Sequence, residues 1–145
     1  MTIEGEYVPS PSAKARNHVE EIEAKGTTEG SDMLGMPIVL LTMKGISGKV
    51  RKVPLMRVEH EGRYAAVASM GGAPKNPKWY ANLTANPVLT LMDGAETKTF
   101  RAREITGDER AEWWERCVAA YPPYADYQEK TERTIPVLVL EPLES

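Results

Sequence analysis

Apolar residues along this chain gather in short runs of strand length. Pro37–Met43 is a continuous apolar run whose length is typical of a buried strand. The same reasoning predicts five further strands, at Val53–Val58, Tyr64–Ser69, Val88–Met92, Thr97–Ile105 and Thr134–Leu140. Pro136 lies inside the last of these runs, and proline within a strand is typical of a sheet edge or a bulge.

Two turn-forming pairs indicate how these strands are connected. Glu61-Gly62 and Asp93-Gly94 each lie between neighbouring strand-like runs and predict tight hairpins. Tight hairpins argue against an α/β fold, in which crossover helices alternate with the strands. We therefore expect a mainly β (α+β) domain whose six short strands, mostly antiparallel, close into a small barrel with flanking helices.

Helical spacing precedes and interrupts these strands. Ser10-Pro11 has the residue types of an N-cap followed by a first helical residue, and Gly26 ends the apolar spacing that follows it. Asn76-Pro77 opens a second helix in the same way, and we expect this helix to cover Lys78–Ala85. It must stop near Asn86, because the next residue is proline.

Two more helical segments lie in the last third of the chain. Thr106 and Glu109 have capping-box spacing at the start of a helix that we expect to reach Ala120. Cys117 lies on the apolar face of this helix, so we interpret it as a small core residue. Pro122-Pro123 ends the helix, and Tyr124–Lys130 is expected to form one or two further turns.

Composition narrows the function. The 145 residues suit one domain, and 18 Lys and Arg against 21 Asp and Glu give a net charge of −3, which argues against nucleic acid as a partner. The chain has no apolar run of the ~20 residues that span a bilayer and no signal peptide, so we expect a cytoplasmic protein. A single cysteine allows no intramolecular disulfide.

The few residues with catalytic or metal-binding chemistry point toward a cofactor. His18 lies among glutamates and His60 beside a turn, so we expect both to be solvated rather than catalytic. Without a cluster of zinc-type ligands, we expect no metal site. If the chain is an enzyme, a borrowed cofactor is expected to supply the chemistry.

The first candidate site is the basic stretch Lys44–Lys52, which places four cations in nine residues of an acidic chain. Ser47-Gly48 gives a turn whose backbone N–H groups can face an anion. The stretch is typical of a clamp for phosphate or carboxylates. A solvated hairpin loop would explain the same residues.

Two further stretches combine glycine or proline with aromatic residues. In the first, Ser69–Tyr80, a strand runs through paired glycines into a helix N-terminus, a geometry that favours an anionic ligand; a plain strand-to-helix loop is the alternative. In the second, Tyr121, Tyr124 and Tyr127 follow at three-residue spacing. These tyrosines could line a pocket, or they could pack at the edge of the core.

Together these stretches resemble the deazaflavin-dependent nitroreductase and quinone reductase family of actinobacteria, which uses coenzyme F420 on a split β-barrel. The resemblance rests on S-G-K-x-R-x-x-P-L at Ser47–Leu55, S-x-G-G-A-P-K-N-P-x-W-Y-x-N-L-x-A-N-P at Ser69–Pro87 and Y-P-x-Y-x-D-Y at Tyr121–Tyr127, and R-T-I-P-V at Arg133–Val137 adds to it. It implies a six-stranded split β-barrel of the flavin/deazaflavin-binding type over 37–142, preceded by a helix and connector in 1–36, within a single domain.

The resemblance also implies a role for each stretch. The basic loop would hold the phosphate and acidic tail of the coenzyme, the next strand would lie along its ring, and the glycine-rich loop and short helix would complete the groove. The implied cofactor residues are Ser47, Gly48, Lys49, Arg51, Lys52, Val53, Pro54, Leu55, Met56, Ala68, Ser69, Met70, Gly71, Gly72, Ala73, Lys78, Trp79, Tyr80 and Asn82. Family members often carry a basic residue just before the Ser/Thr-Gly pair, where this chain has Ile46.

The implied reaction is hydride transfer from the reduced deazaflavin to a quinone, a nitroaromatic compound or an activated enone. Ser69 and Tyr124 are our candidates for catalytic hydrogen-bond donors, and Tyr121, Tyr124 and Tyr127 would border the substrate. An FMN-binding oxidoreductase and a non-enzymatic carrier of F420 are the alternatives. The expected partner is a small-molecule acceptor, with peripheral membrane contact through a lipid quinone left open, and the protein is expected to be a monomer or a homodimer.

Overall fold

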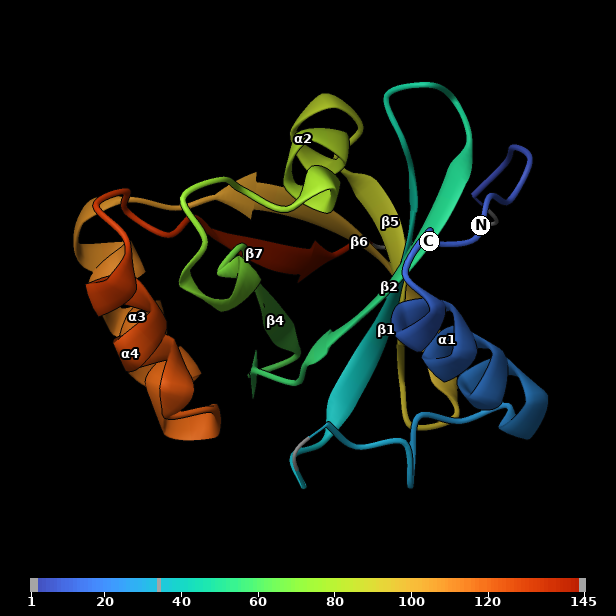
Figure 1. The fold of residues 1–145 in the computed structure, drawn as a ribbon, viewed down its shortest axis with the longest axis horizontal. Coiled ribbons are helices and arrows are strands. Elements are labelled where there is room, and N and C mark those ends of the chain that lie inside the picture. Colours follow the sequence, from blue (N-terminus) through green and yellow to red (C-terminus); the bar gives the residue numbers. More distant parts are fainter. Residues whose placement is uncertain (1–2, 34, 144–145) are drawn as a thin grey trace.

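A computed structural model of the chain describes residues 3–33 and 35–143. Its main feature is a single curled sheet of seven strands with helices on both sides (Figure 1). The strands are β1 Ile38–Lys44, β2 Val50–Met56, β3 Glu59–His60, β4 Arg63–Val67, β5 Val88–Asp93, β6 Glu96–Glu104 and β7 Val137–Pro142. The helices are α1 Ala13–Lys25, the 3₁₀ turn η1 Met70–Gly72, α2 Lys78–Ala85, α3 Gly107–Ala120 and α4 Pro123–Lys130.

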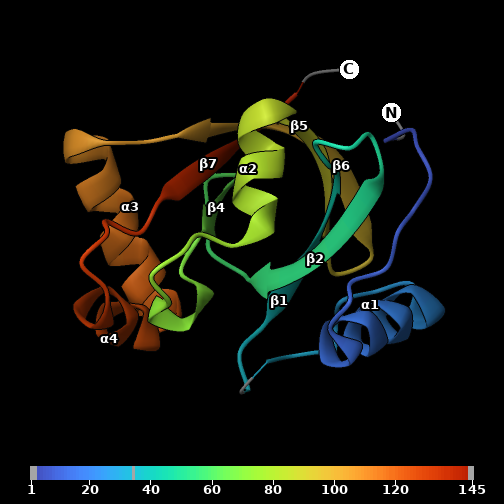
Figure 2. The same ribbon diagram turned by 45° about the horizontal axis from the view of Figure 1, so that its top comes forward.

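All neighbouring strands in the sheet are antiparallel, in the order β2-β1-β5-β6-β7-β4-β3. This confirms the prediction of a mainly β, barrel-like domain with flanking helices, although the sheet has seven strands rather than six. The hairpin at Asp93-Gly94 is also confirmed, because β5 and β6 pair up to Asp93 and Glu96. The sheet curls around α2, while α1, α3 and α4 pack against its outside (Figures 1 and 2).

The sheet is covered on both faces, which explains its continuous apolar runs. Along β7, Leu138 and Leu140 pack in the cluster that contains Trp79 and Leu83 of α2. Their neighbours Val137 and Val139 pack in a second cluster with the core residues of α1, α3 and α4. Successive strand residues point to opposite faces, so a strand covered on both sides needs apolar residues at every position.

Three strand predictions need correction. The strand predicted at Val53–Val58 begins at Val50, ends at Met56 and pairs with β1. The hairpin turn at Glu61-Gly62 is confirmed, with positive φ at both residues, but the arm before it is the two-residue strand β3 rather than the strand predicted at Val53–Val58. Pro136 precedes β7 rather than lying within it, and β7 is an interior strand between β6 and β4, so the predicted edge or bulge is wrong.

The helix starts also differ from their predicted caps. The N-cap of α1 is Ser12, which accepts from the Ala15 N–H, rather than Ser10. At α2 the N-cap is Pro77 rather than Asn76, although the predicted span Lys78–Ala85 is confirmed. Thr106 does cap α3, but without a side-chain hydrogen bond. The capping box is lost because Glu109 forms a bidentate pair with Arg103 of β6 instead.

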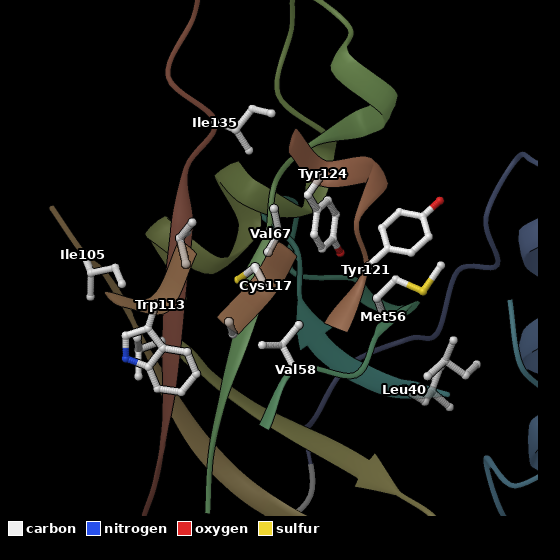
Figure 3. Packing of buried hydrophobic residues seen from close by; sticks show 14 of the residues in the cluster. Leu40, Met56, Val58, Val67, Ile105, Trp113, Cys117, Tyr121, Tyr124 and Ile135 are labelled. Carbon is white, nitrogen blue, oxygen red and sulfur yellow. The ribbon is translucent and has the colours of Figure 1, made fainter. Parts of the chain in front are cut away.

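Cys117 is a core residue, as predicted. Its side chain is fully buried beside Trp113, and burial raises the pKa of the thiol to about 12. Figure 3 shows both residues of α3 packed over the sheet, with Tyr121 and Tyr124 continuing the same cluster toward Met56. The core of this face therefore runs without a break into the tyrosine-rich segment.

Candidate functional site

A cavity of about 850 Å³ lies between α1, β2 and the tyrosine-rich segment of α3 and α4. In Figure 2, α1 and α4 lie on opposite sides of β2, which borders the space between them. Its volume is within the range of small-molecule sites, about 300–1,000 Å³. The lining comprises Ser12, Lys14, Ala15, His18, Glu21, Gly30, Ser31, Asp32, Met33, Val53, Pro54, Leu55, Met56, Val67, Ser69, Met70, Pro77, Trp79, Tyr121, Tyr124 and Tyr127.

One wall of the cavity is the second half of β2, from Val53 to Met56. This half is apolar and paired with β1 along its length, which gives a firm, flat surface. Trp79 adds an aromatic surface from α2, and its own side chain is 7% exposed. These surfaces suit a planar ring system better than a flexible polar ligand.

The second wall is the turn that follows β4. Ser69 is buried, and Met70 has a φ of 47° and is 56% exposed at the cavity. Gly72 is needed for this turn, because a Cβ there would lie 2.8 Å from the Tyr127 carbonyl oxygen and its φ is 84°. The glycine thus lets the turn pack directly on the backbone of α4.

Replacing Gly72 by Ala is expected to destabilise the fold by about 2–3 kcal/mol, because left-handed strain and a backbone clash act together. Urea unfolding of the purified variant measures the change in the free energy of unfolding. Gly71→Ala is the matched control: φ there is 65°, but the added Cβ meets nothing within 4 Å. Equal losses in the two variants would contradict the role of the close contact.

The third wall is formed by three tyrosines. The rings of Tyr121 and Tyr124 meet edge to face with centroids 4.9 Å apart, and both side chains are labelled in Figure 3. The hydroxyls of Tyr121 and Tyr127 are 3.0 Å apart and hydrogen-bonded. Within the described part of the chain, no such bond engages the Tyr124 hydroxyl, which leaves it available to a ligand.

Burial raises the pKa of two tyrosines in this wall, Tyr121 and Tyr124. Desolvation raises the pKa of Tyr124, and the neighbouring Cys117, Tyr121 and Tyr127 raise it further. Desolvation and the hydrogen bond to Tyr127 raise the pKa of Tyr121 to about 12. Both phenols therefore remain protonated, and can donate hydrogen bonds, at neutral pH and also at pH 10, where an ordinary tyrosine is half ionised.

The predicted phosphate clamp is bound to the N-terminal part of the chain. Lys49 pairs with Glu6, and Lys52 pairs with Glu23 of α1. Arg51 donates to the carbonyl oxygens of Val8 and Pro9, at 2.9 and 3.2 Å. Residues 6–9 run beside the start of β2, where Tyr7 and Val50 form a parallel β-bridge. None of these cations lines the cavity, although Val53, the residue after Lys52, does.

Several other predicted site residues lie outside the cavity lining, and two of them connect elements of the fold. The Asn82 side chain accepts from the Ile46 N–H at 3.1 Å, so it ties α2 to the basic loop. Tyr80 donates to Glu104 of β6, and this bond raises its pKa to about 12. The remaining members of this group are Ser47, Gly48, Ala68, Gly71, Gly72, Ala73 and Lys78.

The α1 wall was not predicted. His18, interpreted above as solvated, is half-buried at the cavity, and its Nε2–H donates to the Ser31 carbonyl oxygen at 2.6 Å. The Ser31 hydroxyl is buried at the same wall and has no partner among the described residues. No local pattern could reveal this wall, because α1 reaches the cavity only through tertiary packing.

Comparison with known proteins adds family information to this geometry. The profile of the F420H(2)-dependent quinone reductase family matches residues 14–142. A Mycobacterium tuberculosis protein with the provisional name of F420H(2)-dependent quinone reductase is 40% identical over 96 residues, which cover 66% of this chain and 81% of that protein. The family profile, over residues 14–142, includes all seven strands and every lining residue of the cavity except Ser12.

Solved structures agree with this assignment. The structure of an F420-H2 dependent reductase is 56% identical and superimposes with a TM-score of 0.70, covering 72% of this chain and 94% of that one. A domain-swapped dimer is 52% identical with a TM-score of 0.72, covering 91% and 100%. The predicted split β-barrel and oxidoreductase class are thus confirmed, and the chain belongs to the F420H(2)-dependent quinone reductase family, whose hydride donor is reduced coenzyme F420.

Proposed function

We propose that this chain reduces a quinone, with the deazaflavin ring of F420 against the β2 wall and the quinone between that ring and the tyrosines. The observation that carries the proposal is that one cavity is bordered by an apolar strand on one side and by protonated tyrosines on another. A flat wall suits the ring of the coenzyme, and a hydroxyl-bearing wall suits the carbonyl oxygens of a quinone.

The residues around the cavity fit this cofactor. Val53 to Met56 and Trp79 offer apolar and aromatic surface for the ring. Ser31 offers an unpartnered buried hydroxyl for a polar tail. Lys49, Arg51 and Lys52 on the first part of β2 and the loop before it carry the positive charge that a phosphate and carboxylates require. The coenzyme would reach these cations by lying along β2.

The chain's own residues would complete the reaction. When bound, reduced F420 supplies a hydride to the quinone and releases one proton, and the quinone takes up the hydride and a proton to become a quinol. Tyr124 and Ser69 would donate hydrogen bonds to the quinone oxygen on which negative charge develops. The walls would hold donor and acceptor together and exclude water.

Titration of the purified protein with F420 and, separately, with FMN tests the cofactor. Ligand fluorescence should report F420 binding in the micromolar range or tighter, without competition from FMN. Preferential FMN binding would overturn the assignment of cofactor and clamp. Turnover with a quinone, a nitroaromatic compound and an enone then tests the acceptor: the quinone should give the highest kcat/KM, and tight binding without turnover of any acceptor would favour a carrier.

Removing the negative charges that cover the clamp is expected to tighten F420 binding. The double variant Glu6→Gln/Glu23→Gln frees Lys49 and Lys52, so F420 should bind about fivefold more tightly at low salt. The gain should shrink as ionic strength rises, because these side chains are partly exposed. Glu96→Gln is the control, since its partner Lys98 is exposed on β6. Unchanged or weaker affinity in the double variant would contradict the competition.

Two further expectations concern the membrane and the oligomeric state. Across residues 3–33 and 35–143, no helix has both the length and the apolar character needed to cross a bilayer.

We propose a homodimer, which is motivated by the domain-swapped relative. Light scattering of the purified chain would decide the state.

A further inference from the structure

Arg133 lies between α4 and β7, outside the cavity lining, and its guanidinium binds the loop that follows β4. Nη1 donates to the Ala68 carbonyl at 3.1 Å and to Asn76 Oδ1 at 2.7 Å. Nε and Nη2 donate to the carbonyls of Ala73 and Ser69, both at 2.9 Å. One side chain thus fixes the loop at both ends and in the middle. Figure 1 shows the connection from α4 to β7 beside this loop.

The backbone of the same residue is fixed to α4. Gln128 Nε2 donates to the Arg133 carbonyl at 2.7 Å, and Gln128 Oε1 accepts from the Ile135 N–H at 2.9 Å. Gln128 directly follows Tyr127 of the tyrosine wall. Arg133 is therefore joined through its side chain to the wall that holds Ser69 and through its backbone to the helix that holds Tyr124.

We infer that Arg133 is a positioning residue that fixes Ser69 relative to Tyr124 across the cavity. This inference rests on the function proposed above, in which those two hydroxyls serve the same substrate oxygen. Small displacements of a catalytic group cost large factors in rate, about 10²-fold for 1 Å. A residue that links the two walls therefore affects turnover without touching the substrate.

The chemistry of the site requires arginine rather than any cation. All four acceptors are neutral oxygens: three carbonyls and one amide. Arginine offers five N–H donors in a planar, rigid fork, so one group can reach acceptors on several sides. Lysine offers three donors from one point and would leave buried carbonyls without a partner. The arrangement thus explains why Arg133 pairs with no carboxylate among residues 3–33 and 35–143.

Trypsin cleavage after Lys75 tests the inference without cofactor or substrate. Lys75 is exposed in the loop that Arg133 holds, so cleavage there reports how often the loop opens. In Arg133→Gln, cleavage after Lys75 should accelerate about tenfold, the effect of losing more than one net hydrogen bond. Arg103→Gln is the control, because Arg103 also donates several hydrogen bonds, to Glu109 and Glu141, but contacts neither wall.

Kinetics of the same variants separate positioning from structure. Arg133→Gln should lower kcat for the quinone about 10²-fold, with a smaller change in KM. Arg133→Lys retains the charge, so it should fold like the wild type but reach only part of the wild-type kcat. Guanidinium added to Arg133→Gln should restore part of the lost kcat. If Arg133→Gln does not fold, the trypsin cleavage and the kinetics are both measured on Arg133→Lys.

The outcomes distinguish this inference from the proposed function. Wild-type cleavage after Lys75 together with wild-type kcat in Arg133→Gln would overturn the inference. A fall in thermal stability with unchanged kcat would also overturn it, because a purely structural residue would give that result. Failure of the wild-type protein to bind F420 would overturn the proposed function instead, and the cleavage assay would still report whether Arg133 holds the loop.

Discussion

Replacing Tyr124 by Phe is expected to lower kcat for the quinone about 10²-fold, the usual cost of losing one hydrogen-bond donor to developing negative charge. The ring remains, so packing against Tyr121 and Cys117 should be preserved. The F420 dissociation constant should stay close to wild type, because the coenzyme is proposed to lie against β2. Steady-state kinetics and F420 fluorescence titration measure the two effects separately.

Tyr80→Phe is the matched control for this change. It also removes one phenol hydroxyl, but from a tyrosine that donates to Glu104 outside the cavity, so kcat should be unaffected. The raised pKa of Tyr124 adds a pH criterion: the phenol stays protonated above its ordinary value of 10.0, so kcat should not fall between pH 7 and 10 through loss of this proton. Wild-type kcat in Tyr124→Phe would remove this residue from the mechanism.

Removing two clamp cations is expected to have the second large effect. In Lys49→Ala/Lys52→Ala, F420 should bind about 10²-fold more weakly, because each charge-assisted contact to a phosphate or carboxylate contributes about 1.5–3 kcal/mol. Folding should change little, because both ion pairs reach solvent through their partly exposed carboxylates, and pairs at the surface contribute about 0–1 kcal/mol each. Fluorescence titration at several salt concentrations should also show a shallower salt dependence than in the wild type.

Lys98→Ala/Arg101→Ala provides a control with the same loss of charge. Both residues are exposed on β6, which contributes nothing to the cavity lining. F420 affinity in this control should match the wild type. Equal F420 affinity in the wild type and in both double variants would refute the clamp and leave the apolar walls as the sole basis of binding.

The strands and the short helix α2 could be predicted because their signals are local. Lys78–Ala85 is bounded by proline on both sides, and the predicted span is confirmed. The apolar run of β1 reflects burial on both faces, which any pairing of that strand would require. Errors arose where two local signals competed, as at Ser10 and Ser12, where either serine could cap the helix and the structure selects the second.

Partner choice over long sequence separations could not be predicted. The separation of Glu6 and Lys49 is 43 residues, and nothing near either residue identifies the other. The same holds for His18, whose polar neighbours indicate solvent although the helix places it at the cavity. Glu109 shows the converse case: its capping-box position was recognisable, but Arg103 on β6 offered a stronger, bidentate partner.

The cavity walls differ in how freely evolution can change them. The β2 wall is paired with β1 from end to end, so a new side chain or a shift there would disturb the barrel. The α1 wall is attached to the core through only Val19 and Ile22 among its buried residues, and Lys14 and Glu21 on it are exposed. Substitutions on the cavity face of α1 should therefore cost less stability than substitutions on β2, which makes this helix the wall of the cavity that can change most easily.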